Sequence, residues 1–378
     1  MSRPFNLYDV YEQNLNFLFG AGASFDFLPT LALKLQMENG DSYTFETLAK
    51  ELEESEGSRG ELYTLLFMYY YQRCIEPGLP GFQKGGANQD RVLYEYGKFL
   101  ETLLSVLQRQ GRNDKKCNIY TSNYDNCFEL AADKLVTENR VSCVFNDGSA
   151  GFQKREFHTK NFNTRVIHKG IFDKHEEMIP QVNILHPHGS VYWVHDSKGI
   201  EVSYEDSIYK IELDEQQREL INGFGAIVED QTKDSSDLVQ FKVDNKQQLN
   251  NLRIDDFWSA YKDIPIVNPT KWKFHETVFE EAYYQILRHL SFELERPNTV
   301  LLTFGFSFAD EHILHLIQRS LSNPSLTVYV SCFDDNEKVE MQSKFQGYSN
   351  VKYISIDDEL TFSRFNKTVF TLSQEDDL

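Results

Sequence analysis

Cysteine is scarce in this chain and has no metal-binding spacing. None of its five cysteines belongs to a Cys-x-x-Cys pair; they are Cys74, Cys117, Cys127, Cys143 and Cys332. Zinc ribbons need such pairs, and disulfide-stabilised domains need a denser and more regular cysteine framework. We therefore expect no zinc ion and no disulfide scaffold, and the free thiols are typical of a reducing cytoplasm.

The chain also lacks long hydrophobic runs and an excess of basic charge. No stretch of about 18 consecutive apolar residues occurs, and residues 1–14 have no basic segment followed by an apolar one. These absences argue against secretion and against a membrane protein. With 38 Lys and Arg against 58 Asp and Glu, the formal net charge is −20. Because this charge repels a phosphate backbone, we expect no direct binding of nucleic acid.

Short apolar runs alternate with helical patterns along the chain. Strand patterns occupy 15–19, 118–121, 182–185, 299–304 and 326–330, whereas the clearest helical stripe covers 275–292. This alternation predicts an α/β fold with a mostly parallel sheet covered by helices.

Two segments interrupt this alternation. Residues 42–110 have apolar residues at spacings of three and four, which predicts a helical module, most simply a packed scaffold. Residues 196–262 are polar and uneven, and we interpret them as a peripheral insertion. The main domain would then consist of 1–41 and 111–378.

A glycine-rich turn follows the first predicted strand. It comprises Gly20, Ala21, Gly22, Ala23 and Ser24. Such small residues let backbone N–H groups approach a diphosphate at a helix N-terminus, and Ser24 offers a hydroxyl. The turn is neither a full Gly-x-Gly-x-x-Gly motif nor a P-loop, so a purely structural tight turn explains it equally well.

Polar residues follow the strand at 118–121. Thr121, Ser122, Asn123 and Asp125 come where the strand ends, and ligands of open α/β sheets bind at the carboxyl ends of strands. The alternative is an Asn/Asp-rich turn that caps the next helix.

Two further strands end in turns with potential chemistry. His186-Pro187-His188-Gly189-Ser190 offers a general base or, alternatively, half of a metal site. A third ligand is not spaced nearby, and a structural histidine is the default for either ring. Gly305-Phe306-Ser307-Phe308-Ala309-Asp310 is a second strand-to-helix turn, where Asp310 could simply favour the first turn of the helix.

Taken together and in this order, the motifs GAGAS, TSNYD, HGSVYW and GFSFADEH resemble those of the bacterial sirtuin-like NAD-hydrolysing proteins of anti-phage defence. The resemblance covers about 15–30, 117–135, 182–195 and 264–335 and leaves out both insertions. The length and domain content look most like the stand-alone subunit that pairs with a HerA-type ATPase. The resemblance therefore implies a sirtuin-like fold with a Rossmann-type parallel sheet, NAD as substrate, a homo-oligomer and an ATPase partner.

The resemblance also assigns roles to residues. It implies that Asn123 and His188 are catalytic, and that Gly305, Ser307 and Asp310 lie in a second nucleotide-contacting turn. The expected NAD contacts also include Gly20 to Ser24, Thr121, Ser122 and Asp125. The chain lacks the zinc cysteines of sirtuin deacylases and has Phe25-Asp26-Phe27-Leu28-Pro29 after the glycine turn, with no Asp-Phe-Arg. This favours NAD hydrolysis over deacylation; a deacylase, a non-catalytic NAD or ADP-ribose sensor and an assembly scaffold remain alternatives.

Overall fold

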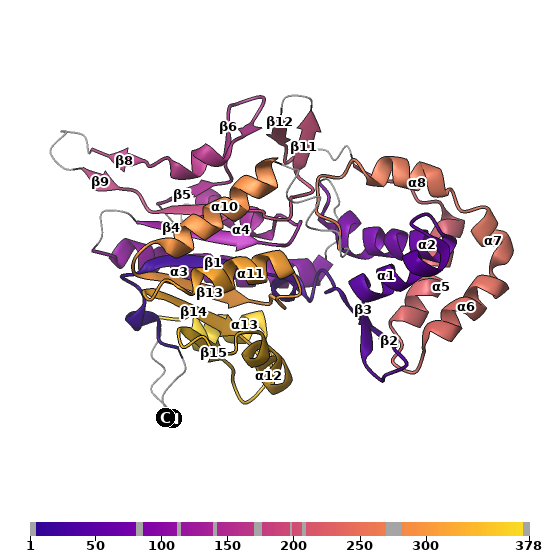
Figure 1. The fold of residues 1–378 in the computed structure, drawn as a ribbon. Coiled ribbons are helices and arrows are strands. Elements are labelled where there is room, and N and C mark those ends of the chain that lie inside the picture. The colour runs from indigo at the N-terminus through magenta and orange to yellow at the C-terminus, as the bar shows by residue number, and fades with distance from the viewer. Residues whose placement is uncertain are drawn as a thin grey trace.

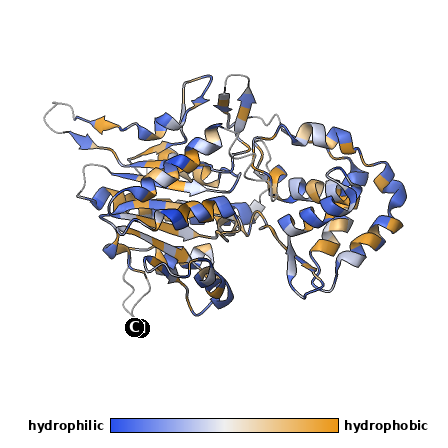
Figure 2. Ribbon diagram, in the orientation of Figure 1, coloured by the Kyte–Doolittle hydropathy of each residue, from blue (hydrophilic) through white to orange (hydrophobic). Residues whose placement is uncertain are grey.

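The computed structural model describes residues 5–80, 86–111, 115–138, 142–169, 176–196, 199–205, 209–269 and 281–372. Figure 1 shows a lobe built on a central sheet beside a smaller lobe that is mostly helical. Hydrophobic residues concentrate along the strands of the sheet and on the inner faces of the helices (Figure 2).

Seven strands form the central sheet, all of them parallel, in the order β15-β14-β13-β1-β4-β10-β5. Their bounds are β1 Asn14–Phe19, β4 Lys116–Thr121, β5 Val144–Asn146, β10 Gln181–Leu185, β13 Thr299–Phe304, β14 Leu326–Ser331 and β15 Val351–Ile354. The predicted parallel sheet and its five strands are confirmed, whereas the edge strands β5 and β15 were not predicted. From β1 the chain runs outward to β4 and β10 and later returns to β13 on the other side of β1. This Rossmann-like order puts a topological switch point between β1 and β13.

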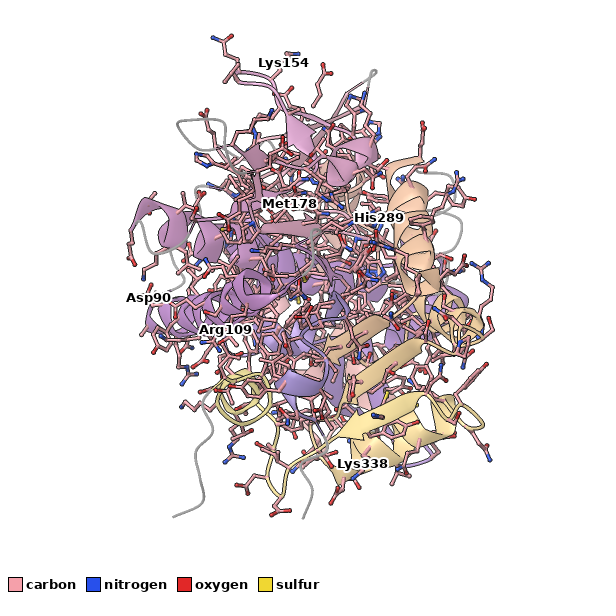
Figure 3. The ribbon with its side chains drawn as sticks, turned by 90° about the vertical axis from the view of Figure 1, so that its left-hand side faces the viewer. Asp90, Arg109, Lys154, Met178, His289 and Lys338 are labelled. Atoms are coloured by element: carbon pink, nitrogen blue, oxygen red, sulfur yellow. The ribbon has the colours of Figure 1, made fainter. Side chains whose placement is uncertain are left out.

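Helices cover both faces of the sheet. Phe17 and Phe19 of β1 pack in one core with α3 (Gly86–Arg109), α4 (Cys127–Thr137) and α13 (Phe362–Arg364). Leu18 points the other way, into a core with α10 (Glu281–Glu295), α11 (Glu311–Ser320) and α12 (Asp335–Lys344). In Figure 3, Asp90 and Arg109 on α3 and His289 on α10 mark the two covering layers on opposite sides. The predicted helix at 275–292 corresponds to α10, and residues 275–280 lie outside the described residues.

The smaller lobe has a hydrophobic core of its own, built from two distant parts of the chain. Its elements are β2 (Ala32–Gln36), β3 (Ser42–Thr44), α1 (Phe45–Glu56), α2 (Glu61–Tyr70), α5 (Glu215–Val228), α6 (Ser235–Asp244), α7 (Lys246–Asn250) and α8 (Ile254–Tyr261). Helix α2 lies at its centre and is buried from Leu62 to Tyr70.

The boundaries of the two lobes differ from those of the predicted insertions at 42–110 and 196–262. Helix α3, which we had grouped with the helical module at 42–110, packs on the central sheet. The segment 196–262 is not peripheral in its packing, because its helices bury apolar residues against α2. The sequence hides this pairing, since the two halves of the core are more than 100 residues apart.

Short strands complete the sheet lobe. One small sheet contains β11 (Trp193–Asp196), β12 (Gly199–Val202), β7 (Glu156–Phe157) and β6 (Ser149–Ala150), and β8 (Ile167–His168) pairs with β9 (Glu177–Met178). Lys154 projects from the β6–β7 loop at the outer edge of this lobe (Figure 3). Within the described part of the chain, no helix has the length and apolarity needed to cross a bilayer.

Candidate functional site

The glycine turn after β1 does not open an α-helix. Residues Ala21–Ser24 form a single 3₁₀ turn, and the chain continues into the β2–β3 hairpin of the smaller lobe. The predicted helix N-terminus after this turn is therefore wrong, because the segment that follows packs into another core.

The glycines of this turn allow it to contact the turn that follows β13. The Gly20 N–H donates to Phe304 O at 3.0 Å, and the Gly22 N–H donates to Gly305 O at 3.1 Å. A Cβ atom on Gly20 would overlap Gly305 O, and one on Gly22 would lie 2.7 Å from Gly305 Cα. Gly305 itself has φ +61°, in the left-handed region that favours glycine. Backbone packing at the switch point thus explains why glycine is needed at these three positions.

Several amides of the glycine turn are already hydrogen-bonded within the protein. Besides Gly20 and Gly22, the Ala23 N–H donates to Gly20 O at 3.0 Å. These three N–H groups have protein acceptors in this arrangement. Contact of the turn with a diphosphate remains a prediction.

Ser24 joins the glycine turn to Asn123 and Asp125. The Asn123 amide donates from Nδ2 to Ser24 Oγ at 3.3 Å, and Ser24 Oγ donates to Asp125 Oδ2 at 3.1 Å. The Tyr96 hydroxyl, from α3, lies 2.8 Å from the same Ser24 oxygen. All four residues are buried, and burial raises the pKa of Tyr96 well above its usual value. Three predicted site residues therefore meet in one polar cluster.

The turn that carries Asn123 is fixed by its neighbours. Thr121 Oγ1 accepts from the Asn123 N–H at 3.2 Å, and the Ser122 N–H donates to Phe19 O at 3.0 Å. Asp125 Oδ1 accepts from the Cys127 N–H at 2.9 Å, at the start of α4. The helix-capping alternative thus applies to Asp125, while Asn123 keeps its side chain toward Ser24.

His188 lies against Asp310. Its Nε2 atom is 2.7 Å from Asp310 Oδ2, and both side chains are buried. The other oxygen of Asp310 accepts from the His312 and Ile313 N–H groups at the start of α11. The expected helix-favouring role of Asp310 is therefore confirmed, and the same carboxylate also contacts the predicted general base.

Gly189 allows the His188 turn to lie directly against the main chain of residues 265–267, which follow α8. Gly189 has φ +80°, and a Cβ atom there would overlap Pro265 O. The Val267 N–H donates to His188 O at 2.8 Å, and Tyr124 donates its hydroxyl to Val267 O at 2.6 Å. The main chain of 265–267 therefore fixes both the His188 turn and the Asn123 turn.

The Gly305–Asp310 turn is also held from outside. Phe308 is buried with φ +54°, a conformation that costs a bulky residue energy. Lys344 donates to Ser307 O at 2.8 Å and to Phe308 O at 3.3 Å. The Ser307 hydroxyl accepts from the Ala309 N–H at 3.4 Å, and its side chain is exposed.

His186 and His188 take different partners and do not form a metal pair. His186 Nε2 lies 2.8 Å from Glu129 Oε1, on α4, and His186 Nδ1 lies 3.1 Å from Asn123 O. Across the described ranges, no group of three or more His, Cys, Asp or Glu is arranged to hold a metal ion.

Two contacting residues were missed from the sequence. Tyr96 belongs to an apolar helical stripe, and Glu129 lies in the helix after the Asn123 turn. The only available signal was indirect: a tyrosine in a buried stripe needs a partner for its hydroxyl.

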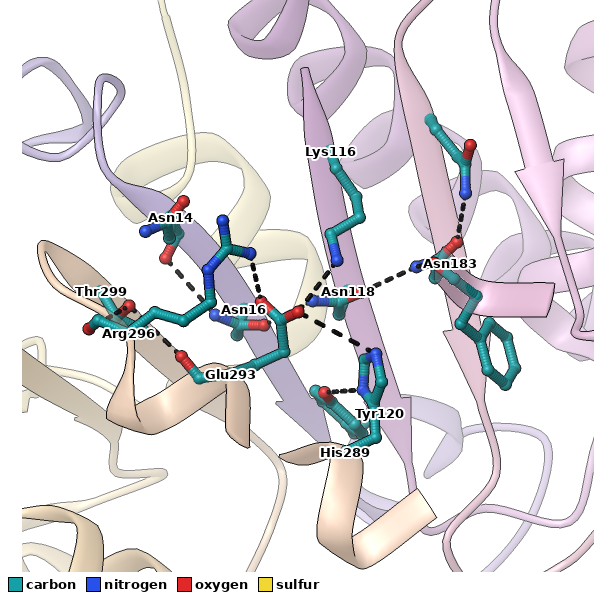
Figure 4. A network of polar contacts seen from close by, with 12 residues as sticks. Asn14, Asn16, Lys116, Asn118, Tyr120, Asn183, His289, Glu293, Arg296 and Thr299 are labelled. Atoms are coloured by element: carbon teal, nitrogen blue, oxygen red, sulfur yellow. Dashed lines mark hydrogen bonds and ion pairs between the residues drawn. The ribbon is translucent and has the colours of Figure 1, made fainter. Parts of the chain in front are cut away.

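A second polar cluster extends from the edge where the strands begin into the middle of the sheet (Figure 4). Lys116, the first residue of β4, is 2.9 Å from Glu293 of α10, which also pairs with Arg296 at 2.8 Å. Asn16, Asn118 and Asn183 form hydrogen bonds across β1, β4 and β10. Because its charges are paired and it lies away from the carboxyl ends of the strands, we interpret this cluster as structural.

The predicted residues gather at one edge of the sheet, on turns that are bonded to each other. The glycine turn contacts the Gly305 turn and the Asn123 turn, the Asn123 turn contacts the His186–Ser190 segment, and His188 contacts Asp310. Compared with known protein families and with curated proteins, the chain matches none.

Proposed function

We propose that this protein hydrolyses NAD at the nicotinamide–ribose bond, releasing nicotinamide and ADP-ribose. The observation that carries the proposal is the juxtaposition at the switch point of a Rossmann-like sheet: Asn123 is held by Ser24, and His188 is paired with Asp310. Dinucleotides bind at such crevices in open α/β sheets.

Cleavage of this bond does not require the enzyme to protonate the leaving group. The ring nitrogen of nicotinamide is already cationic, so the electrons of the broken bond neutralise it, and nicotinamide departs without protonation. The site mainly has to hold the ribose and stabilise the developing oxocarbenium ion. The Asn123 amide would orient the ribose hydroxyls or the attacking water, whose oxygen bonds to the ribosyl carbon.

His188 would accept the proton that the water or a ribose hydroxyl releases. With Nε2–H directed at the Asp310 carboxylate 2.7 Å away, a neutral ring keeps its lone pair on Nδ1. Asp310 would fix this tautomer and stabilise the imidazolium that forms, as carboxylates do for catalytic histidines in other enzymes.

Asp310→Asn tests this pairing. Asparagine is a good N-cap, so α11 keeps its cap while the charge beside His188 disappears. We expect nicotinamide release to fall about 10²-fold or more, measured by chromatography of NAD reactions, with little change in the melting temperature. An unchanged rate in the folded variant would contradict the role of Asp310.

Supplying NAD alone or with an acylated peptide separates hydrolysis from the rival activities. A hydrolase consumes NAD without the peptide, a deacylase needs it, and a sensor binds NAD without forming product.

The cellular part of the proposal rests on the resemblance of the four motifs. It comprises membership of the sirtuin-like NAD hydrolases, a homo-oligomer, a HerA-type ATPase partner and anti-phage defence by depletion of NAD. Since an unrestrained NAD hydrolase would poison its own cell, we expect the activity to depend on assembly or on a trigger.

A further inference from the structure

His186 touches the proposed catalytic turn without belonging to the proposed chemistry. Its side chain is 4% exposed, and both ring nitrogens have a partner. Nδ1 lies 3.1 Å from the Asn123 main-chain oxygen, and Nε2 lies 2.8 Å from Glu129 Oε1.

Both partners of the ring are acceptors. A carbonyl oxygen and an ionised carboxylate have no hydrogen to donate, whereas a neutral imidazole has one N–H and one lone pair. A neutral ring would therefore direct its lone pair at one of these oxygens. With Glu129 ionised, only a ring with hydrogen on both nitrogens satisfies the two contacts together.

We propose that His186 is held as an imidazolium that positions Asn123 through its main chain, so that deprotonation of His186 releases this turn and lowers activity. The catalytic consequence rests on the proposed function. The charge state itself rests only on the geometry of His186, Asn123 and Glu129.

The surrounding charges favour this state. Glu129 is largely buried at 12% side-chain exposure, and its second oxygen has no hydrogen bond from the described residues, so the imidazolium is the group that balances its charge. Asp125, from the turn before α4, also acts electrostatically on the ring. Burial by itself would lower the pKa of His186, but Glu129, the Asn123 carbonyl and Asp125 together raise it above the usual value.

The His186 ring contacts Asn123, a residue that is held by three hydrogen bonds. Asn123 donates its main-chain N–H to Thr121 Oγ1 and its side chain to Ser24 Oγ, and its carbonyl accepts from His186. A ring that loses one proton keeps the other on Nε2, because the Glu129 carboxylate is a stronger acceptor than the Asn123 carbonyl. Deprotonation therefore removes the third contact and frees the carbonyl side of the turn. Because a displacement of about 1 Å in a catalytic group can cost about 10²-fold in rate, this contact is enough to control activity.

Histidine NMR on the full chain measures the charge state directly. The His186 signal is assigned as the one missing from His186→Gln, and its titration is followed from pH 5.5 to 9. We expect His186 to titrate above an ordinary histidine, with the doubly protonated ring still predominant at pH 7. Glu129→Gln keeps an oxygen acceptor of the same size but removes the charge, and should lower the pKa of His186 by about one unit, a tenfold weaker proton affinity.

Asp133→Asn on the same helix is the matched control, because Asp133 is exposed. It should leave the His186 titration within a few tenths of a unit. A native His186 that is neutral at pH 7, or one whose titration ignores Glu129→Gln, would overturn the proposal.

The pH profile of nicotinamide release tests the consequence for catalysis. In Glu129→Gln a neutral ring can keep its hydrogen on Nδ1, toward the Asn123 oxygen, and accept the glutamine N–H at Nε2. The native loss of activity on the alkaline side should therefore disappear in this variant, while the rate at pH 6 stays near the native one. An unmoved profile with a shifted titration would overturn the positioning role. If His186 titrates as expected but no form of the protein cleaves NAD, the proposed function is contradicted, while the imidazolium state of His186 is supported.

Discussion

At the scale of single residues, close backbone approach accounts for the glycine turn more firmly than phosphate binding does. Gly20 has an ordinary extended φ of −122°, so only space forbids a side chain there. Its neighbours, Gly305 O and Phe306 Cα, are backbone atoms that cannot rotate away. The two turns at the switch point can therefore lie in backbone contact only because Gly20 has no side chain.

Gly20→Ala should consequently destabilise the protein. We expect a loss of about 1–3 kcal/mol, the usual cost of overpacking, measured as a lower midpoint in urea unfolding. Gly97→Ala is the control, since Gly97 lies within α3 with nothing within 4 Å of a new Cβ. That change should stabilise by about 0.5–1 kcal/mol. Equal effects of the two substitutions would refute the packing argument.

His186 should also make stability depend on pH. Its pKa is raised in the folded protein, so its protonation stabilises the fold fully below the unfolded value of about 6.5 and loses this effect as pH rises through the folded pKa. The free energy of unfolding of the native chain relative to His186→Gln should thus shrink between pH 6.5 and 9. A difference that grows with pH in urea titrations would show the opposite sign.

At the scale of helices and strands, the buried pair at the amino edge of the sheet joins α10 to β4. Lys116 and Glu293 each have 3% side-chain exposure. Burial lowers the pKa of Lys116, and Glu293 opposes this by stabilising the charged form.

Glu293→Gln should leave Lys116 buried beside an uncharged partner and cost about 3–5 kcal/mol. The matched control on the same helix is Glu295→Gln. Glu295 is 58% exposed and lies 3.7 Å from Arg319, and such surface pairs contribute at most about 1 kcal/mol. Thermal unfolding of both variants measures the contrast, and similar melting temperatures would mean that the buried pair contributes little.

The elements also show how far the sequence could be interpreted. Periodicity located β1, β4, β10, β13 and β14, because buried parallel strands are continuous apolar runs. It missed β5 and β15, where partly exposed edge strands break that pattern. It also assigned α3 to the wrong core, since an apolar stripe predicts that a helix is buried but not what it packs against.

The site residues were predictable in type, while their partners were not. Asn123, His188 and Ser24 follow strands, and strand ends converge in a parallel sheet. The pairing of His188 with Asp310 joins residues 122 positions apart, and no local spacing encodes such a contact.

At the scale of the whole molecule, the proposed site lies where the two lobes meet. A main-chain hydrogen bond from Val267, which follows α8 of the smaller lobe, holds the His188 turn. The smaller lobe thereby supports the proposed catalytic residues.

Nicotinamide release from NAD by the native chain, Asn123→Ala and His188→Ala tests the central claim most directly. The three proteins are assayed alone and with the proposed HerA-type ATPase partner, after circular dichroism has established that the variants are folded. We expect the native chain to release nicotinamide, at least in the assembly, and each variant to fall by about 10²-fold or more. Release at the native rate by either folded variant, or none by the native chain in both settings, would contradict the account.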